Sequence, residues 1–157
     1  MRIKNQKGFS LIELLIVVAI ILIIAAIAIP NLLRSRMAAN EASAVGSMRT
    51  VNTSCVTYST TYGIGFPSTL ATLGTSGGVS STSAQLLDNV LASGAKSGYT
   101  FTYTAGTAAG GVIPTYTLTA APITPGQTGQ RYFFTDQSGV IRFNVSAAAT
   151  VSDSPLQ

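Results

Sequence analysis

An unbroken apolar run near the amino terminus constrains this 157-residue chain more than any other feature. Sixteen consecutive apolar residues extend from Leu14 to Ile29, and Pro30 follows them. The segment from Phe9 to Ile29 has 21 residues, and about 20 residues at a 1.5 Å rise cross the ~30 Å hydrocarbon core of a bilayer. A helix with no polar side lies in a membrane or in a fully enclosed core. Since 157 residues leave too little material to enclose it, the run predicts a membrane-spanning helix.

A single acidic residue, Glu13, lies at the start of this run. A carboxylate costs about 2.5–3.5 kcal/mol at the centre of a membrane-spanning helix and less near its end, so we expect it to have a partner. No Lys or Arg lies between Gly8 and Ile29. A proteolytic cut after Gly8 would supply one, because the new amino group of Phe9 would lie one helical turn before Glu13.

The residues before the apolar run favour such a cut and predict the orientation of the chain. Gly8 has no side chain, so an extended backbone there can enter a protease cleft. Arg2, Lys4 and Lys7 form a short basic block directly before Gly8. Basic residues stay on the cytoplasmic side of a membrane, so the carboxy-terminal part is predicted to face outward.

The block Gly8-Phe9-Ser10-Leu11-Ile12-Glu13, with its basic leader and the apolar run, resembles a type IV prepilin of the pilin and pseudopilin superfamily. The resemblance implies that a membrane-embedded prepilin peptidase cuts between Gly8 and Phe9 and then N-methylates Phe9. It also implies that mature subunits leave the inner membrane through the pilus assembly machinery and form an extracellular filament of identical subunits. Glu13 would set the register by pairing with the Phe9 amine of an adjacent subunit.

The same resemblance implies that the filament serves adhesion, twitching motility or DNA uptake. The sequence does not distinguish among these uses. It also assigns Pro30 a role as a flexible point in the helix. Proline lacks a backbone donor and crowds the carbonyl of Ala26, so Pro30 predicts a helix kink on physical grounds as well.

After Pro30 the pattern becomes amphipathic. Apolar residues recur at helical spacing and predict one stripe that packs on a sheet: Leu33, Met37, Ala44, Met48, Val51, Cys55, Tyr58 and Tyr62. Polar and charged residues are expected off this stripe: Arg34, Arg36, Asn40, Glu41 and Arg49. We therefore predict one helix from about Phe9 to Tyr62, ended by the Gly63–Pro67 segment.

The rest of the chain predicts an antiparallel sheet after a Gly/Ser/Thr-rich connection. Two weak helical turns are expected in the connection, at Ser68–Leu73 and at Ser83–Leu91, with Ser83 as N-cap and Gly94 as stop. Aromatic residues alternate with threonine around residues 99–103 and 115–119, and residues 131–145 predict a hairpin with the turn Asp136–Gly139. This half also resembles the globular head of Gram-negative pilins.

The expected fold is therefore an α+β type IV pilin fold, in which a long amino-terminal helix packs on a sheet of about four strands. We divide the chain into a cleaved leader (1–8), a transmembrane or filament-core helix (9–30), an amphipathic helix (31–62), the connection (63–98), and the β head with a polar tail (99–157). The tail from Ser146 to Gln157 is expected to be loosely held.

Composition argues against an enzyme and against cofactor or metal binding. The chain has no histidine, and it offers no nucleophile–base pair or clustered carboxylates. Asp136 is interpreted as a turn residue and Asp88 as a helix-surface residue. Arg131, Arg142 and Lys96 are interpreted as solvated sheet-edge residues, since three charges make a weak nucleic-acid site.

The cysteine count limits how the β head can be held together, and the net charge limits which partners it can bind. Cys55 is the only cysteine, so the carboxy-terminal loop must be held by hydrogen bonds and packing where many pilins use a disulfide. We interpret Cys55 itself as a small buried hydrophobe. The net charge of +4 falls to +1 without the three basic leader residues, which leaves nucleic-acid binding unsupported.

Three alternatives stay open at the level of sequence. Ala26-Ile27-Ala28 has the small-residue pattern of a secretory cleavage site, but the apolar run exceeds the usual 7 to 15 residues and contains Glu13. A pseudopilin of a type II secretion system shares the amino-terminal motif, although the carboxylate-rich calcium loop that would favour it is missing. A membrane-anchored binding domain that never polymerises is the third alternative.

Overall fold

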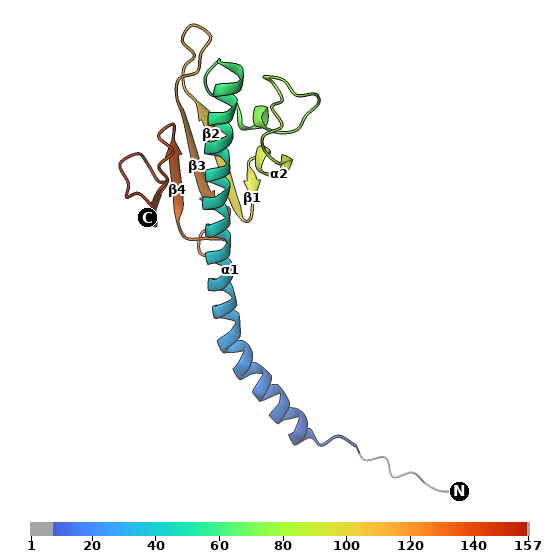
Figure 1. The fold of residues 1–157 in the computed structure, drawn as a ribbon. Coiled ribbons are helices and arrows are strands. Elements are labelled where there is room, and N and C mark those ends of the chain that lie inside the picture. The colour runs from blue at the N-terminus through green and yellow to red at the C-terminus, as the bar shows by residue number, and fades with distance from the viewer. Residues whose placement is uncertain (1–7, 157) are drawn as a thin grey trace, which may run out of the picture. The chain divides into compact units, whose positions relative to one another are not determined.

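The computed structural model describes residues 8–156, so the predicted leader residues Arg2, Lys4 and Lys7 lie outside the described part. The chain divides between Ser35 and Arg36 into two compact units, which are described separately. Helix α1, Leu11–Tyr62, contributes to both units, and the second unit also contains the sheet and the short helices (Figure 1). The predicted α+β class with one long amino-terminal helix is confirmed.

Helix α1 has 52 residues and begins two residues after the predicted start. It continues through Pro30 and ends where the glycine-rich segment was predicted to end it. Gly63 has φ +68°, and its backbone N–H donates to the Ser59 carbonyl at 3.0 Å. A glycine in the left-handed conformation just after the last helical residue is a common helix terminator.

Five antiparallel strands form one sheet in the order β1-β2-β3-β4-β5. They are β1 Ala95–Lys96, β2 Tyr99–Ala105, β3 Tyr116–Pro122, β4 Tyr132–Asp136 and β5 Arg142–Asn144. Strands β2 and β3 lie where the alternating pattern predicted them, and β4 and β5 form the predicted hairpin. Strand β1 was missed because two residues are too few to show a period of two.

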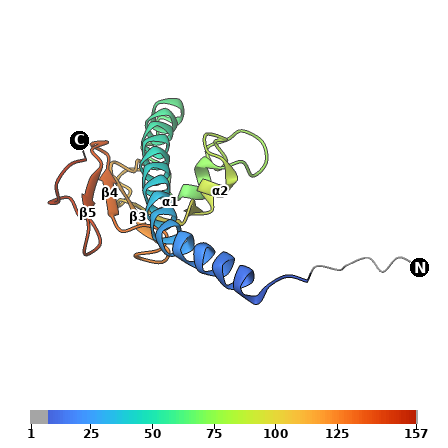
Figure 2. The ribbon, with the colours of Figure 1, turned by 90° about the horizontal axis from the view of Figure 1, so that it is seen from below.

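The carboxy-terminal half of α1 packs on one face of this sheet. The amphipathic stripe supplies the helix side of the core through Ala44, Met48, Val51, Cys55 and Tyr58. The alternating residues of the strands supply the other side, namely Tyr99, Phe101, Tyr116, Leu118, Ala120 and Phe133. Figure 2, a view from below, places β3, β4 and β5 to one side of α1 and α2 to the other.

The connection contains the two predicted turns, but the second is shorter than predicted and begins at Asn89. Its predicted stop is confirmed, since Gly94 has φ +86° and its N–H donates to the Leu91 carbonyl at 3.0 Å. A 3₁₀ turn, η1 Leu70–Leu73, begins after Thr69, whose side chain accepts from the Thr72 backbone N–H. Helix α2, Asn89–Ala92, is capped by Asp88, so the predicted N-cap Ser83 is wrong. The Ser83 hydroxyl is instead buried and accepts a hydrogen bond from the Ser76 backbone N–H at 3.1 Å.

The tail is tied to the sheet, contrary to the prediction that it is loosely held. The Phe143 N–H donates to the Ser154 carbonyl at 3.1 Å, and the Leu156 N–H donates to the Ile141 carbonyl at 2.7 Å. Asp153 closes the loop between these contacts by accepting from the Asn144 side chain at 2.9 Å. Backbone pairing along the sheet edge therefore holds this segment, a signal that its small polar residues do not carry.

Candidate processing and assembly segment

The start of α1 is fixed by a reciprocal cap. Ser10 precedes the helix, and its hydroxyl accepts from the Ile12 backbone N–H at 3.3 Å. The Glu13 carboxylate folds back and accepts from the Ser10 backbone N–H at 2.9 Å. This is a capping box, in which two N–H groups that a helix start leaves unpaired find side-chain acceptors.

The capping box gives Glu13 a role that the sequence interpretation missed. The spacing Ser10-x-x-Glu13 is a known signal of a helix start, and it could have been read from the sequence. In the described residues Glu13 has no cationic partner, and Ser10 N–H is the only donor to its carboxylate. A carboxylate has about four acceptor positions, so Glu13 can cap its own helix and still accept a further donor.

The apolar side chains in the first part of α1 are exposed and pack against no other element in the described part of their unit. Phe9 is 82% exposed, and the large side chains of Leu11 to Ile29 are all at least 45% exposed. Helix α1 is the one helix among the described residues that is long and apolar enough to cross a membrane. A surface this apolar needs an apolar environment, either lipid or other helices of the same kind.

Gly8 lies in irregular backbone before α1, with open space around it. A Cβ built on Gly8 meets no atom within 4 Å, and its φ is not in the left-handed region. The residue is exposed, so access for a protease is not obstructed in the described part of the chain. A larger side chain at Gly8 would thus leave the fold of the chain intact, which makes it a clean position to test.

In the second unit, a polar clamp fixes the loop before β4 to helix α1. Glu41 is only 8% exposed and was wrongly predicted to lie off the apolar stripe on the polar side. One carboxylate oxygen accepts from the backbone N–H groups of Gln130 (2.8 Å) and Arg131 (3.1 Å). The other accepts from Arg131 Nε at 2.7 Å, and the guanidinium lies over the rings of Phe133 and Phe143.

The balance of effects on Glu41 keeps it ionised. Burial, the largest single effect, raises the pKa of its carboxyl, but the hydrogen bonds from Gln130 and Arg131 together outweigh it, so the pKa lies below its ordinary value. The clamp joins residues about 90 positions apart. Periodicity in the sequence could not reveal it, because a lone Glu on a helix gives no sign of its distant partner.

The other predicted sheet-edge cations are also engaged. Lys96 pairs with Asp88 at 2.9 Å, and Arg142 donates to the Asp153 carbonyl at 2.9 Å. Both residues lie on the edge strands of the sheet, as predicted, and are partly exposed, but each also has a partner within the chain. Asp136 is the turn residue that was predicted, since it accepts from the Ser138 N–H at 2.9 Å.

Cys55 lies inside the core, as the stripe predicted. It is fully buried beside the hydroxyls of Tyr103 and Tyr116, and burial raises the pKa of its thiol to about 12. A thiol of this kind is inert at neutral pH, because the thiolate is the reactive form. Among the described residues, no group of three or more His, Cys, Asp or Glu side chains gathers to hold a metal ion.

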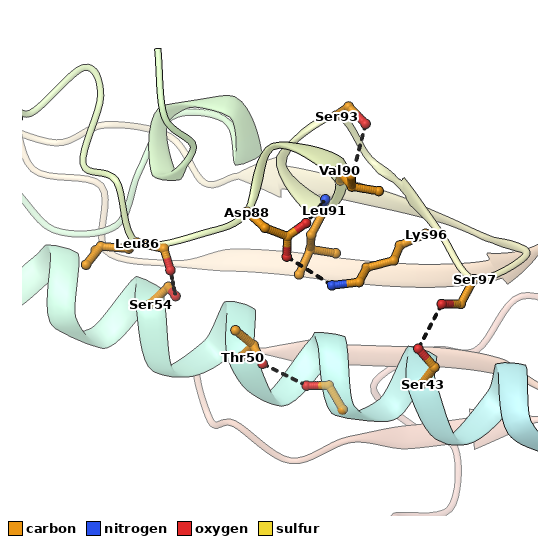
Figure 3. A network of polar contacts seen from close by, with 11 residues as sticks. Ser43, Thr50, Ser54, Leu86, Asp88, Val90, Leu91, Ser93, Lys96 and Ser97 are labelled. Atoms are coloured by element: carbon orange, nitrogen blue, oxygen red, sulfur yellow. Dashed lines mark hydrogen bonds and ion pairs between the residues drawn. The ribbon is translucent and has the colours of Figure 1, made fainter. Parts of the chain in front are cut away.

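A groove runs along the flank of α1 that faces the connection. It is lined by Arg49, Thr50, Thr53, Ser54, Thr57 and Leu86. Figure 3 shows Ser54 of this flank donating to the Leu86 carbonyl, at 3.2 Å, and Thr50 bonded back to its own helix. Thr53 and Thr57 also donate to carbonyls one turn earlier. The hydroxyl hydrogens are thus used, and the groove presents methyl groups, oxygen lone pairs and the Arg49 guanidinium.

Comparison with known proteins places the amino-terminal segment in a recognised class. The family model described as "Prokaryotic N-terminal methylation motif" matches residues 3–29. This range contains Gly8, Phe9 and Glu13 and ends one residue before Pro30. No solved structure gives a significant match to the chain.

Two known relatives are named as type IV pilus or fimbrial proteins. The chain is 66% identical over 38 residues to the "Type IV wide pilus major component PilA4" of Thermus thermophilus, covering 24% of this chain and 29% of the relative. It is 54% identical over 54 residues to the "Type IV major fimbrial protein FimA" of Dichelobacter nodosus, covering 32% and 35%.

The matches span about a third of the length of these relatives, so they say nothing about the remainder of either protein. Within that limit, the motif and the relatives agree with each other and with the α+β fold built on a long apolar helix. Together they show that the amino-terminal segment of this chain is similar to that of type IV pilins.

Proposed function

We propose that this chain is a structural subunit of a type IV pilus, processed after Gly8 and assembled into a surface filament. The observation that carries the proposal is the uncovered apolar helix with one carboxylate at its start. Such a helix is suited first to the membrane and then to a bundle of identical helices. The pilus names of the relatives support the same conclusion.

In this proposal, a prepilin peptidase cuts between Gly8 and Phe9, and Phe9 is then N-methylated. The new terminus is cationic and begins one residue before Ser10, whose N–H already contacts Glu13. Glu13 keeps its cap on α1 and accepts the amine of Phe9 from an adjacent subunit. Because lipid is as apolar as the helix, packing alone discriminates little between lipid and filament, whereas an ion pair in apolar surroundings fixes the register.

Pro30 is proposed to let the helix bend during assembly. It lies inside α1 and removes one backbone donor, which loosens the helix around Ala26. The precursor would reside in the inner membrane, and the assembled subunit would lie at the cell surface. Adhesion, twitching motility and DNA uptake are uses of such a filament that this proposal leaves open.

Two variants test the proposal in cells that produce the chain. Gly8→Val is expected to block processing, so that the full precursor stays in the membrane fraction and no filament is sheared from the cells. Glu13→Ala is expected to be processed normally and to yield at least tenfold less sheared filament. Asp88→Asn, which changes an exposed carboxylate of the head, serves as the matched control and should leave both readouts unchanged.

The outcomes separate the two steps. Normal cleavage of Gly8→Val would contradict the assigned cleavage site. Wild-type amounts of filament from Glu13→Ala would contradict the role of the carboxylate in assembly, even if the cleavage site is correct.

A further inference from the structure

The charged groups of the second unit are nearly all used within the chain. Four acids lie there, and both carboxylate oxygens accept hydrogen bonds in three of them: Glu41, Asp88 and Asp153. Asp136 differs, because Oδ1 accepts from the Ser138 N–H while Oδ2 has no partner among the described residues. It is the last residue of β4, at the start of the turn to β5.

Most cations of the same unit also have partners within it. Lys96, Arg131 and Arg142 each donate to an oxygen of the second unit. Arg36 and Arg49 do not, as far as the described residues go, and both are exposed on α1. Of these two, Arg49 lines the groove described above. The second unit therefore presents two charged groups that can still bind a partner. They are the Asp136 carboxylate, with one free oxygen, and the Arg49 guanidinium in the groove.

These two features lie on opposite flanks of α1 at the same level. Asn52 donates to Thr135 Oγ1 (3.1 Å) and to the Gly139 carbonyl (3.4 Å), which places the β4–β5 turn beside α1 at this residue. Ser54, two residues further on, donates to Leu86 of the connection on the groove side. Both ribbon views agree that β4 and α2 lie on different sides of the helix (Figures 1 and 2).

The turn and the groove are chemically complementary. The tip Asp136–Val140 offers a carboxylate, the amide donors of Gln137 and the exposed methyl groups of Val140. The groove offers a guanidinium, threonine oxygens whose hydrogens are already used, and an apolar rim at Leu86. The charge of the tip thus has an opposite charge in the groove, and the Gln137 amide donors have threonine oxygens that can accept.

We propose that the β4–β5 turn of one subunit docks into the α1 groove of a second copy of this chain, with Asp136 paired to Arg49. The contact is heterologous, because two different surfaces meet, and a heterologous contact that does not close into a ring generates an open helical filament. The proposal rests on the filament function above and adds to it a contact between heads, separate from the apolar helices.

Cysteine cross-linking in native filaments tests the contact. The full chain carries Gln137→Cys together with Thr57→Cys, and filaments sheared from cells are oxidised and run without reductant. A ladder of covalent multimers is expected, because each subunit would link to the next. The native Cys55 is buried and stays out of the reaction. Gln137→Cys with Arg36→Cys is the matched control pair and should stay monomeric.

Several outcomes would overturn the contact. Filaments that form but give only monomers from the Gln137 and Thr57 pair would contradict it, as would an equal ladder from the control pair. Dimers from either single variant would indicate a symmetric contact instead. If the wild-type chain forms no filament at all, the proposed function itself fails, and that result is distinct from the others.

A charge exchange gives an independent readout that does not depend on cysteine geometry. Arg49→Asp is expected to lower the amount of sheared filament roughly tenfold, since like charges facing each other across a contact are unfavourable. Adding Asp136→Arg in the same chain should restore most of it. Arg36→Asp should not be rescued by Asp136→Arg, and rescue there would place the partner of Asp136 at the wrong arginine and refute the proposal.

Discussion

Replacing Glu41 by Gln tests how the head is held together. The side chain keeps its shape, and its amide oxygen can still accept from the backbone N–H groups of Gln130 and Arg131. The amide NH₂ group, however, then faces Arg131 Nε, from which the carboxylate now accepts at 2.7 Å. The charge-assisted hydrogen bond is thus lost, and two N–H donors face each other. Because residue 41 is only 8% exposed, water cannot easily relieve this contact.

The expected loss follows from the kind of contact that is removed. A hydrogen bond to a charged group contributes about 1.5–3 kcal/mol, and the 35% exposure of the Arg131 side chain places the cost in the lower half of that range. We expect the free energy of unfolding of the head to fall by about 2 kcal/mol, which lowers the Tm by roughly 6–10 °C for a unit of this size.

The assay follows the near-ultraviolet circular dichroism of the buried tyrosines during thermal unfolding of the full chain in detergent. Asp88→Asn is the matched control, because it removes an ion pair with side chains 34% and 49% exposed yet retains an oxygen for the helix cap. An exposed pair contributes about 0–1 kcal/mol. Equal Tm values for wild type and Glu41→Gln would refute the stabilising role of the clamp.

The same pair of proteins predicts a pH dependence. The folded-state pKa of Glu41 lies below its ordinary value of 4.5, so the carboxylate stabilises the fold above that pH. This contribution is lost as the pH falls through the folded-state pKa. The difference in Tm between wild type and Glu41→Gln should be constant from neutral pH to about 5 and should narrow below 4.5. A difference that widens on acidification would contradict the sign of the effect.

Three further predictions concern the core. Met48→Ala should lower the free energy of unfolding by about 2–5 kcal/mol in the same thermal assay, because Met48 is fully buried between helix and sheet; a loss below about 1 kcal/mol would contradict tight packing there. Gly129→Ala should cost about 1–3 kcal/mol, since a Cβ there would overlap the Tyr99 hydroxyl oxygen. Gly78→Ala is the comparison, because Gly78 has open space around it and no left-handed φ. Cys55 should resist alkylation at neutral pH in the folded chain and react in denaturant; rapid labelling of the native protein would show that the thiol is accessible.

The long helix was predictable because its two signals are local and strong. The apolar run from Leu14 to Ile29 is long enough for a membrane helix, the apolar stripe after Pro30 has a helical period, and Gly63 marks the end. Strands β2 and β3 were equally visible, since aromatic or apolar residues alternate with threonine along them, and the turn at Asp136–Gly139 indicated the hairpin of β4 and β5. Strand β1 and the capping role of Asp88 depend on one or two residues, which carry too little pattern to distinguish them from the surrounding connection.

The contacts that fix the head were not predictable in the same way. Glu41 looks like a surface residue of the helix, and only the fold brings Gln130 and Arg131 to it. The tail is held by the edge strand rather than by its own composition. At the amino terminus the residue types pointed to processing and assembly, while the Ser10–Glu13 cap was readable from its spacing but overlooked.

The mass of the subunit in native surface filaments tests the central claim most directly. Filaments sheared from cells and seen by electron microscopy are dissolved, and the intact subunit is measured by mass spectrometry. The account predicts a chain that begins at Phe9 and carries one added methyl group on its amino terminus. A subunit that retains its first eight residues, a chain that begins near Asn31, or a protein found only as single molecules in the membrane would contradict it.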